Sequence, residues 1–287
     1  MEGFQYRPLE TPTIIRLVEL PINTSNGDAE DAKPELVLRQ YELADNLQKY
    51  RALSYVWGGT TKRNLISLNG QDFWVTDSLM SFLKRPRTET FYYWIDAISL
   101  DQDDEEEKAS QIPRMKEIYE NAAYVFADLG PASEDEELAV DHILEIARVV
   151  LPFLEKGLEK FAAEDDLKNL DEEDLENLTL ALQRPVPEVM DIVGCPLIEP
   201  YEEKVWSRIG GFFYRPYWTR AWIMQEATAI EYPALWYGNK TCNLQEAWTA
   251  ALASRLWGNA NLGGTIGRRW ETSATFGGFF RFVISDI

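Results

Sequence analysis

Three short apolar runs constrain the fold of this chain most. They are RALSYVWGG (51–59), FYYWIDAISL (91–100) and YVFADLG (124–130). Runs of this length, rich in β-branched and aromatic residues, are typical of strands buried on both faces of a parallel sheet. Between the second and third runs, apolar residues recur at helical spacing, with Ser110 as the expected cap. This order of strand, helix and strand predicts an α/β fold with a parallel sheet flanked by helices.

Additional β elements are predicted in the N-terminal part. TIIRLVEL (13–20) and ELVLRQYEL (35–43) have the composition of strands. NLISLNGQDFWVT (64–76) contains Asn-Gly between two alternating segments, which indicates a hairpin. DSLMSFLKR (77–85) then predicts a helix with Asp77 or Ser78 as its cap.

Residues 131–200 have a different character, because they form acidic amphipathic patterns of helical period. We interpret them as a helical insertion within one domain that spans residues 1–287. The α/β pattern resumes with a strand at 233–238 and a helix at 243–254. Because the sequence stops inside an apolar run, we expect it to be a piece of a longer protein.

Charge and composition exclude several classes of function. The chain has 48 acidic and 28 basic residues, a formal charge of −20, which disfavours nucleic acid as a partner. The single histidine, His142, and two distant cysteines give no support to a metal site or to catalysis by histidine. We expect no cofactor, and any chemistry must use carboxylates, hydroxyls and arginines.

Nothing in the sequence indicates export or membrane insertion. The N-terminus MEGFQYRPLE lacks the basic and apolar regions of a signal peptide. No apolar run approaches the roughly 18 residues of a membrane span. The expected location is therefore cytoplasmic, with no membrane partner.

One charged residue stands in an otherwise apolar helix pattern. WTRAWIMQEATAI (218–230) is apolar on nearly every side, yet it contains Glu226. A buried carboxylate needs a partner or a function, because removing its charge from water costs several kcal/mol. Glu226 is either directed at a ligand or paired with Arg215 or Arg220.

Polar and glycine residues follow two of the predicted parallel strands. Since open α/β sheets bind ligands beyond the carboxyl ends of their strands, these residues are candidate substrate-binding groups. They are Trp57, Gly58, Gly59, Asp96, Asp101 and Gln102. Alternatives remain open: the tryptophan can be a core residue, the glycines can serve the backbone, and Asp96 and Gln102 can cap a helix or turn. The acidic run 103–107 is expected to be a solvated loop or helix start.

Four stretches resemble the signature blocks of the fungal heterokaryon-incompatibility (HET) domain. In order they are RALSYVWGG, WIDAISLDQ, QIPRMKEIYENAAYVFADLG and RPYWTRAWIMQEA, which together cover roughly residues 50–230. The second block departs from the family, which usually has Cys-Ile-Asn where this chain reads Ala97-Ile98-Ser99. A thiol function at that position is thus excluded. The resemblance implies a role in fungal non-self recognition and programmed cell death.

HET domains are in turn similar to TIR domains, which implies a flavodoxin-like parallel sheet. The pattern Trp222-Ile223-Met224-Gln225-Glu226 resembles the Trp-x-x-x-Glu helix of the TIR domains that cleave NAD. This resemblance implies that Glu226 is the catalytic carboxylate and that Trp222 lines the pocket. Independently of this resemblance, Arg208, Arg215 and Arg220 cluster beside the helix, which makes Arg220 a candidate for binding an anionic small molecule.

The chemistry of NAD cleavage is compatible with a single carboxylate. Nicotinamide leaves as a neutral molecule from a cationic ring, so the reaction needs stabilisation of an oxocarbenium-like ribose rather than a general acid. The leading hypothesis is therefore a NAD glycohydrolase, with NAD or a related nucleotide as substrate. Two alternatives remain: a non-enzymatic module that self-associates or binds a partner protein, and a transferase that acts on another nucleoside.

Overall fold

A computed structural model describes most of the N-terminal half of the chain and parts of the remainder. The described residues are 4–23, 33–43, 49–59, 61–163, 203–220, 226, 229 and 233–253. They belong to two compact units. The first comprises residues 1–131 and 225–239, and the second comprises residues 132–224 and 240–287.

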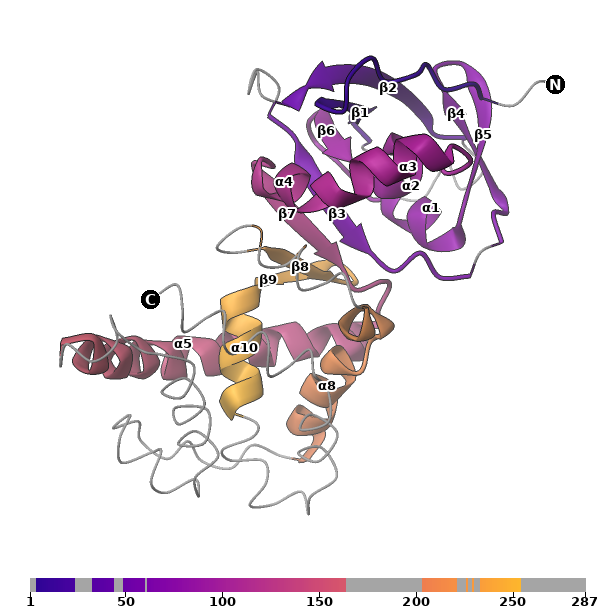
Figure 1. The fold of residues 1–287 in the computed structure, drawn as a ribbon. Helices are drawn as coiled ribbons and strands as arrows, with labels where there is room; N and C mark the ends of the chain where they lie inside the picture. The colour runs from indigo at the N-terminus through magenta and orange to yellow at the C-terminus, as the bar shows by residue number, and fades with distance from the viewer. Residues whose placement is uncertain are drawn as a thin grey trace. The chain divides into compact units, whose positions relative to one another are not determined.

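The predicted parallel strands lie side by side in the first unit (Figure 1). They are β3 (Arg51–Tyr55), β6 (Phe91–Trp94), β7 (Tyr124–Asp128) and β8 (Ala234–Tyr237). Strand β3 pairs in parallel with β6 on one side and with β7 on the other, and β7 pairs in parallel with β8. The expected α/β architecture with parallel strands is therefore confirmed for this part of the sheet.

The N-terminal strands make the whole sheet mixed rather than parallel. They are β1 (Ile14–Leu20), β2 (Glu35–Glu42), β4 (Asn64–Leu68) and β5 (Gln71–Val75). Strand β1 is antiparallel to both β2 and β6, so the order in the first unit is β5-β4-β2-β1-β6-β3-β7-β8. The predicted hairpin between β4 and β5 is confirmed, and its turn residues Asn69 and Gly70 have φ angles of 52° and 79°.

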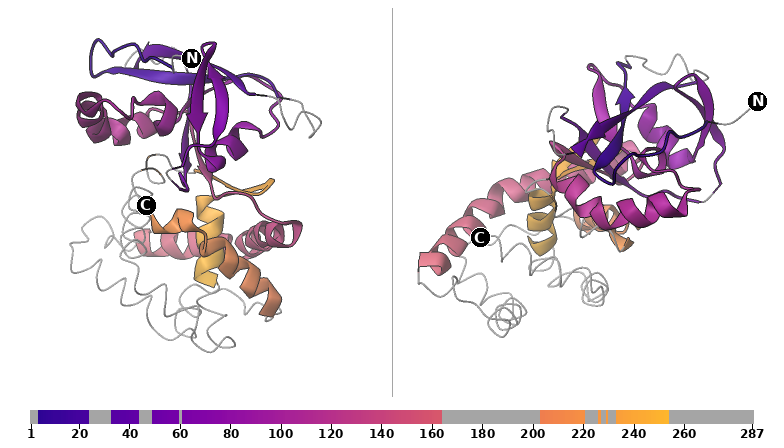
Figure 2. Two further views of the ribbon diagram at one scale, coloured as in Figure 1. Left: turned by 90° about the vertical axis from the view of Figure 1, so that its right-hand side faces the viewer. Right: turned by 45° about the horizontal axis from the view of Figure 1, so that its top comes forward.

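Helices cover both faces of this sheet, which the left view of Figure 2 shows edge on. On one face, α1 (Asp77–Leu83) packs its apolar side on Leu53, Tyr55 and Tyr93. On the other face, α4 (Met115–Glu120) packs on Ala52, Trp94 and Val125. Alternate residues of β3 thus enter two separate apolar clusters, which explains why its sequence lacks a polar face.

Three local predictions were wrong, each because a side chain satisfies a backbone group. The strand expected at 91–100 ends at Trp94, and helix α2 (Asp96–Ser99) follows, where Ser99 Oγ accepts a hydrogen bond from the Ile95 amide at 3.0 Å. Helix α1 is capped by Thr76 rather than by Asp77 or Ser78. The helix predicted to begin at Ser110 begins earlier, as α3 (Glu105–Gln111). Its N-cap is Asp104, whose side chain accepts hydrogen bonds from the backbone amides of Glu106 and Glu107. It continues through a 3-10 turn, η2 (Ile112–Arg114), into α4.

The second unit is mainly helical in its described part. It contains α5 (Glu134–Ala163), α8 (Glu203–Phe213), the 3-10 turn η4 (Pro216–Thr219), β9 (Lys240–Asn243) and α10 (Leu244–Ala253). Helix α5 begins with four acidic residues, and Asp135 binds Arg208 of α8 at 2.5 Å. Helix α5 confirms the helical pattern predicted for this part of residues 131–200. Residues 164–202 of the expected insertion lie outside the described residues.

Among the described residues, no helix combines the length and the apolar character needed to cross a lipid bilayer.

The packing of α4 on β3 predicts that the Tyr119 hydroxyl stabilises the folded protein. Tyr119 is buried and its Oη donates to the Leu53 carbonyl oxygen at 3.0 Å. We expect Tyr119→Phe to lower the free energy of unfolding by about 1 kcal/mol, because a buried hydrogen bond is lost. Urea titration measures this, and Tyr124→Phe is the control because Tyr124 is 57% exposed. Equal effects of the two substitutions would contradict the prediction.

Candidate functional site

The candidate site lies at the carboxyl ends of β3, β6 and β7. Because these strands are parallel and adjacent, the residues that follow or end them lie at the same edge of the sheet. Ser54 and Trp57 come from the end of β3, Asp96 follows β6, and Asp128 ends β7. Each of these side chains has a polar partner.

Glu226 is buried in the first unit beside strand β3. Its side chain is only 1% exposed, and Ser54 Oγ donates a hydrogen bond to Glu226 Oε2. Ser54 is equally buried and lies opposite Ala127 of β7. Glu226 is a buried carboxylate, as its sequence context predicted, whereas Ser54 was not among the predicted site residues. The available signal was a serine inside the apolar run RALSYV.

Trp57 and Asp96, both predicted site residues, are joined by a hydrogen bond. Trp57 Nε1 donates to Asp96 Oδ2 at 2.8 Å, and 37% of the tryptophan remains exposed. The other carboxylate oxygen, Oδ1, accepts from the Ala97 amide at 2.7 Å in the first turn of helix α2. Asp96 is therefore the first residue of this helix and also a group that orients the indole, whereas the N-cap position belongs to Ile95. An exposed indole fixed at one edge is suited to stacking on a flat ring.

Gln102 lies with Asp96, whereas Asp101 mainly organises its own loop. Gln102 Nε2 donates to the Asp96 carbonyl oxygen at 2.9 Å. Asp101 Oδ1 accepts from the Asp103 amide at 3.1 Å. The structure thus brings Trp57, Asp96 and Gln102 together through hydrogen bonds. Asp101 precedes Gln102 in the chain, and its side chain accepts from the Asp103 amide in the same loop.

The two predicted glycines differ in their surroundings. Gly58 has a φ of +75°, and a Cβ atom there would lie 2.8 Å from Ser78 Oγ. Gly59 has no such φ, and its nearest neighbour would be 4.0 Å away. Gly58 is required by the backbone, as the alternative interpretation expected.

The two remaining predicted site residues belong to the second unit. Arg220 follows η4 and its guanidinium lies 6.0 Å from the centre of the Tyr217 ring. Trp222 lies outside the described residues. Arg215, the other arginine considered as a partner of Glu226, donates to Glu136 Oε1 at 2.9 Å.

A further buried carboxylate lies at the end of β7. Arg85 Nη2 donates to Asp128 Oδ1 at 2.6 Å, and Arg85 Nη1 donates to the Gly238 carbonyl oxygen at 2.6 Å. Burial raises the pKa of Asp128, and the neighbouring Arg85 opposes that increase. This pair, which joins the ends of β7 and β8, was not predicted from the sequence.

The acidic run 103–107 was expected to be solvated, and for Glu107 this was wrong. Glu107 is 8% exposed and forms an ion pair with Arg16 of β1. The prediction of a helix start was right, because α3 begins at Glu105. Within the part of the chain that the structure describes, no cluster of histidine, cysteine and acidic side chains could hold a metal ion.

Comparison with known proteins gives the family. The family described as heterokaryon incompatibility protein (HET) matches residues 50–226, which is more than half of the chain. The chain belongs to this HET family, as the resemblance of its four signature blocks implied. The matched region begins just before β3 and ends at Glu226.

One curated relative is heterokaryon incompatibility protein 6, OR allele, of Neurospora crassa. The alignment has 37% identity over 117 positions and covers 36% of this chain and 17% of the relative. The chain thus spans about a sixth of the length of that relative. No solved structure matches the chain.

The backbone geometry at Gly58 predicts that alanine destabilises the protein more at this position than at the neighbouring Gly59. We expect Gly58→Ala to lower the free energy of unfolding by about 1–2 kcal/mol, because a left-handed φ strains an L-residue and the new Cβ meets Ser78. Gly59→Ala is the matched control and should change stability by less than about 0.5 kcal/mol. Urea unfolding of both variants measures the difference. A Gly58→Ala protein as stable as the control would show that this turn does not require glycine.

Proposed function

We propose that this chain is a TIR-like NAD glycohydrolase domain of fungal non-self recognition, with Glu226 as its catalytic residue. In this proposal, NAD cleavage at the bond between nicotinamide and ribose leads to programmed cell death. The observation that carries the proposal is the buried Glu226 carboxylate, which Ser54 holds at the carboxyl end of the central parallel strand. Membership of the HET family supports the incompatibility role.

The order of the parallel strands supports a TIR-like site. Numbered along the chain, β3, β6, β7 and β8 are the first to fourth parallel strands, and their order in the sheet is second, first, third, fourth. This is the beginning of the flavodoxin-like order, in which ligands bind where the first and third strands meet. Here those strands are β3 and β7, and the Ser54–Glu226 hydrogen bond lies beside them.

The surroundings of Glu226 suit the stabilisation of positive charge. As the bond to nicotinamide breaks, charge develops on the ribose, and a carboxylate in an apolar environment acts on it more strongly than one in water. Ser54 orients this carboxylate before the substrate binds, so little reorganisation is needed during the reaction. The exposed indole of Trp57, fixed by Asp96, would stack on one of the flat rings of NAD.

Glu226→Gln tests this assignment. We expect nicotinamide release from NAD to fall by about 100-fold or more, because the variant removes the charge that stabilises the transition state. The glutamine carbonyl can still accept the Ser54 hydrogen bond, so the melting temperature should change little. Chromatography quantifies nicotinamide, with the protein assayed both dilute and concentrated. Glu106→Gln removes an exposed carboxylate of α3 and is the control.

A second candidate function is a non-enzymatic module that acts through self-association or a partner protein. The observation that favours it is the 1% exposure of Glu226, which equally suits a residue that fastens its segment to β3. In that case wild-type protein releases no nicotinamide at any concentration, and Glu226→Ala, which cannot accept the Ser54 hydrogen bond, loses stability whereas Glu226→Gln keeps it. Such a result would refute the enzymatic proposal.

A further inference from the structure

We infer that the buried pair Arg16–Glu107 positions the loop that carries Asp96 and Gln102, and so sets the nucleotide-binding side of the proposed site. This inference rests on the proposed function. Arg16 and Glu107 are positioning residues in it, because their contacts are with the loop and not with the substrate. The two residues come from β1 and α3 and are 91 positions apart in the sequence.

Arg16 and Glu107 form a bidentate ion pair in the interior of the first unit. Arg16 Nη1 lies 2.5 Å from Glu107 Oε1, and Nη2 lies 2.8 Å from Oε2. The side chains are only 2% and 6% exposed. A planar guanidinium that binds both oxygens of a carboxylate fixes the orientation of both groups.

The same two side chains also hold the backbone of the loop. Arg16 Nη1 donates to the Ser99 carbonyl oxygen at 3.2 Å, and Glu107 Oε1 accepts from the Asp101 amide at 2.8 Å. Tyr6 adds a third point, since its Oη donates to the Ile98 carbonyl oxygen at 3.0 Å and its ring centre lies 4.8 Å from the Arg16 guanidinium carbon. Side chains outside the loop therefore bind three of its four successive residues 98–101, and two of these side chains, Arg16 and Tyr6, are more than 80 positions away in the sequence.

The held loop connects directly to the site. It continues helix α2, which has only four residues and starts at Asp96. Gln102 at its far end bonds back to the Asp96 carbonyl oxygen, and the Asp96 carboxylate accepts from Trp57. A displacement of Ser99 or Asp101 would therefore move the groups that orient the indole.

Stability alone does not account for a charged pair at this place. Transferring both charges out of water is costly, and apolar side chains of similar volume often give equal or greater stability. Apolar side chains, however, cannot donate to the Ser99 carbonyl or accept from the Asp101 amide. The charged pair therefore contributes orientation: its directional hydrogen bonds fix the positions of the Ser99 carbonyl and the Asp101 amide.

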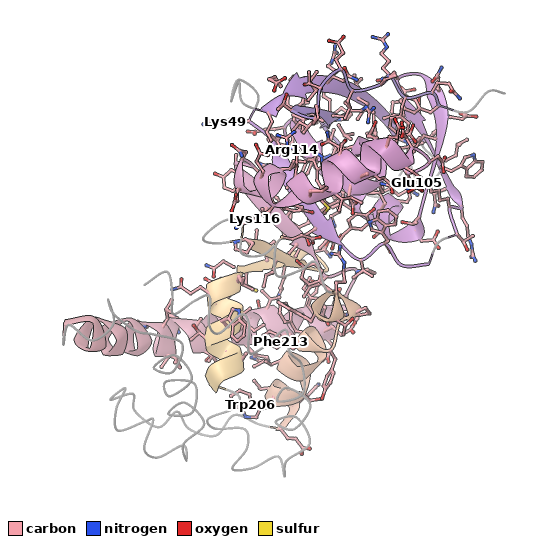
Figure 3. The ribbon with its side chains drawn as sticks, in the orientation of Figure 1. Lys49, Glu105, Arg114, Lys116, Trp206 and Phe213 are labelled. Carbon is pink, nitrogen blue, oxygen red and sulfur yellow. The ribbon has the colours of Figure 1, made fainter. Side chains whose placement is uncertain are left out.

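The test compares Glu107→Gln and the double variant Arg16→Met/Glu107→Leu with Glu105→Gln. Glu105 lies on the same helix (Figure 3), where its side chain is 87% exposed and pairs with Lys108. We expect amide hydrogen exchange of residues 96–102 to accelerate by about 10-fold or more in the first two variants, while β3 and β7 stay within about two-fold of wild type. With NAD as substrate, KM should rise by about 10-fold and kcat should change little, because binding groups are displaced while Glu226 is not. Glu105→Gln should match wild type in every measurement.

Each other result overturns the inference. Unchanged exchange of 96–102 in a folded variant would show that the pair does not hold the loop. Equal acceleration in all peptides would show a purely structural role, and a freed loop with unchanged KM would show that the site does not depend on it. If Glu107→Gln fails to fold, the double variant decides, because it leaves no unpaired buried charge. If the wild type releases no nicotinamide, the proposed function fails, and the exchange measurement separately decides whether the pair holds the loop.

Discussion

The parallel pairing of β3 between β6 and β7 is the constraint on which the rest of the first unit depends. Because all three strands run in the same direction, the segments that leave them must turn at one edge of the sheet. Burial of β3 on both faces requires apolar residues along it, and Ser54 is the exception among its four fully buried residues. That exception lies where Glu226 reaches the strand.

The polar groups at this edge are hydrogen-bonded to one another in pairs. Ser54 binds Glu226, Trp57 binds Asp96, and Arg85 binds Asp128. A buried or partly buried polar group without a partner costs free energy, so such pairing is a condition of folding. It also orients a carboxylate and an indole in advance, which is what a binding or catalytic site requires. The HET match extends from the start of β3 to Glu226 and so covers all three pairs.

Most strands and helices of the described chain could be predicted from sequence because their signals are local. The apolar runs of β3 and β7 and the Asn-Gly turn between β4 and β5 each lie within about a dozen residues. The early end of β6 could not be predicted, since Trp94 and Leu100 belong to one apolar run. Helix α2 interrupts that run because Ser99 and the Asp96 side chain satisfy nearby amides. The acidity of 103–107 likewise indicated a helix start but not which of its acids is buried.

The sequence by itself determined the α/β class, the parallel strands and the family, because periodicity, turn residues and signature blocks are properties of short segments. It also identified Glu226 as a buried carboxylate. Only the tertiary structure decided that Ser54, 172 positions away, is a partner of this carboxylate, and that Glu107 is buried against Arg16. The physical reason is that a hydrogen bond requires two atoms within about 3 Å, and which distant residues meet that condition depends on how strands and helices pack.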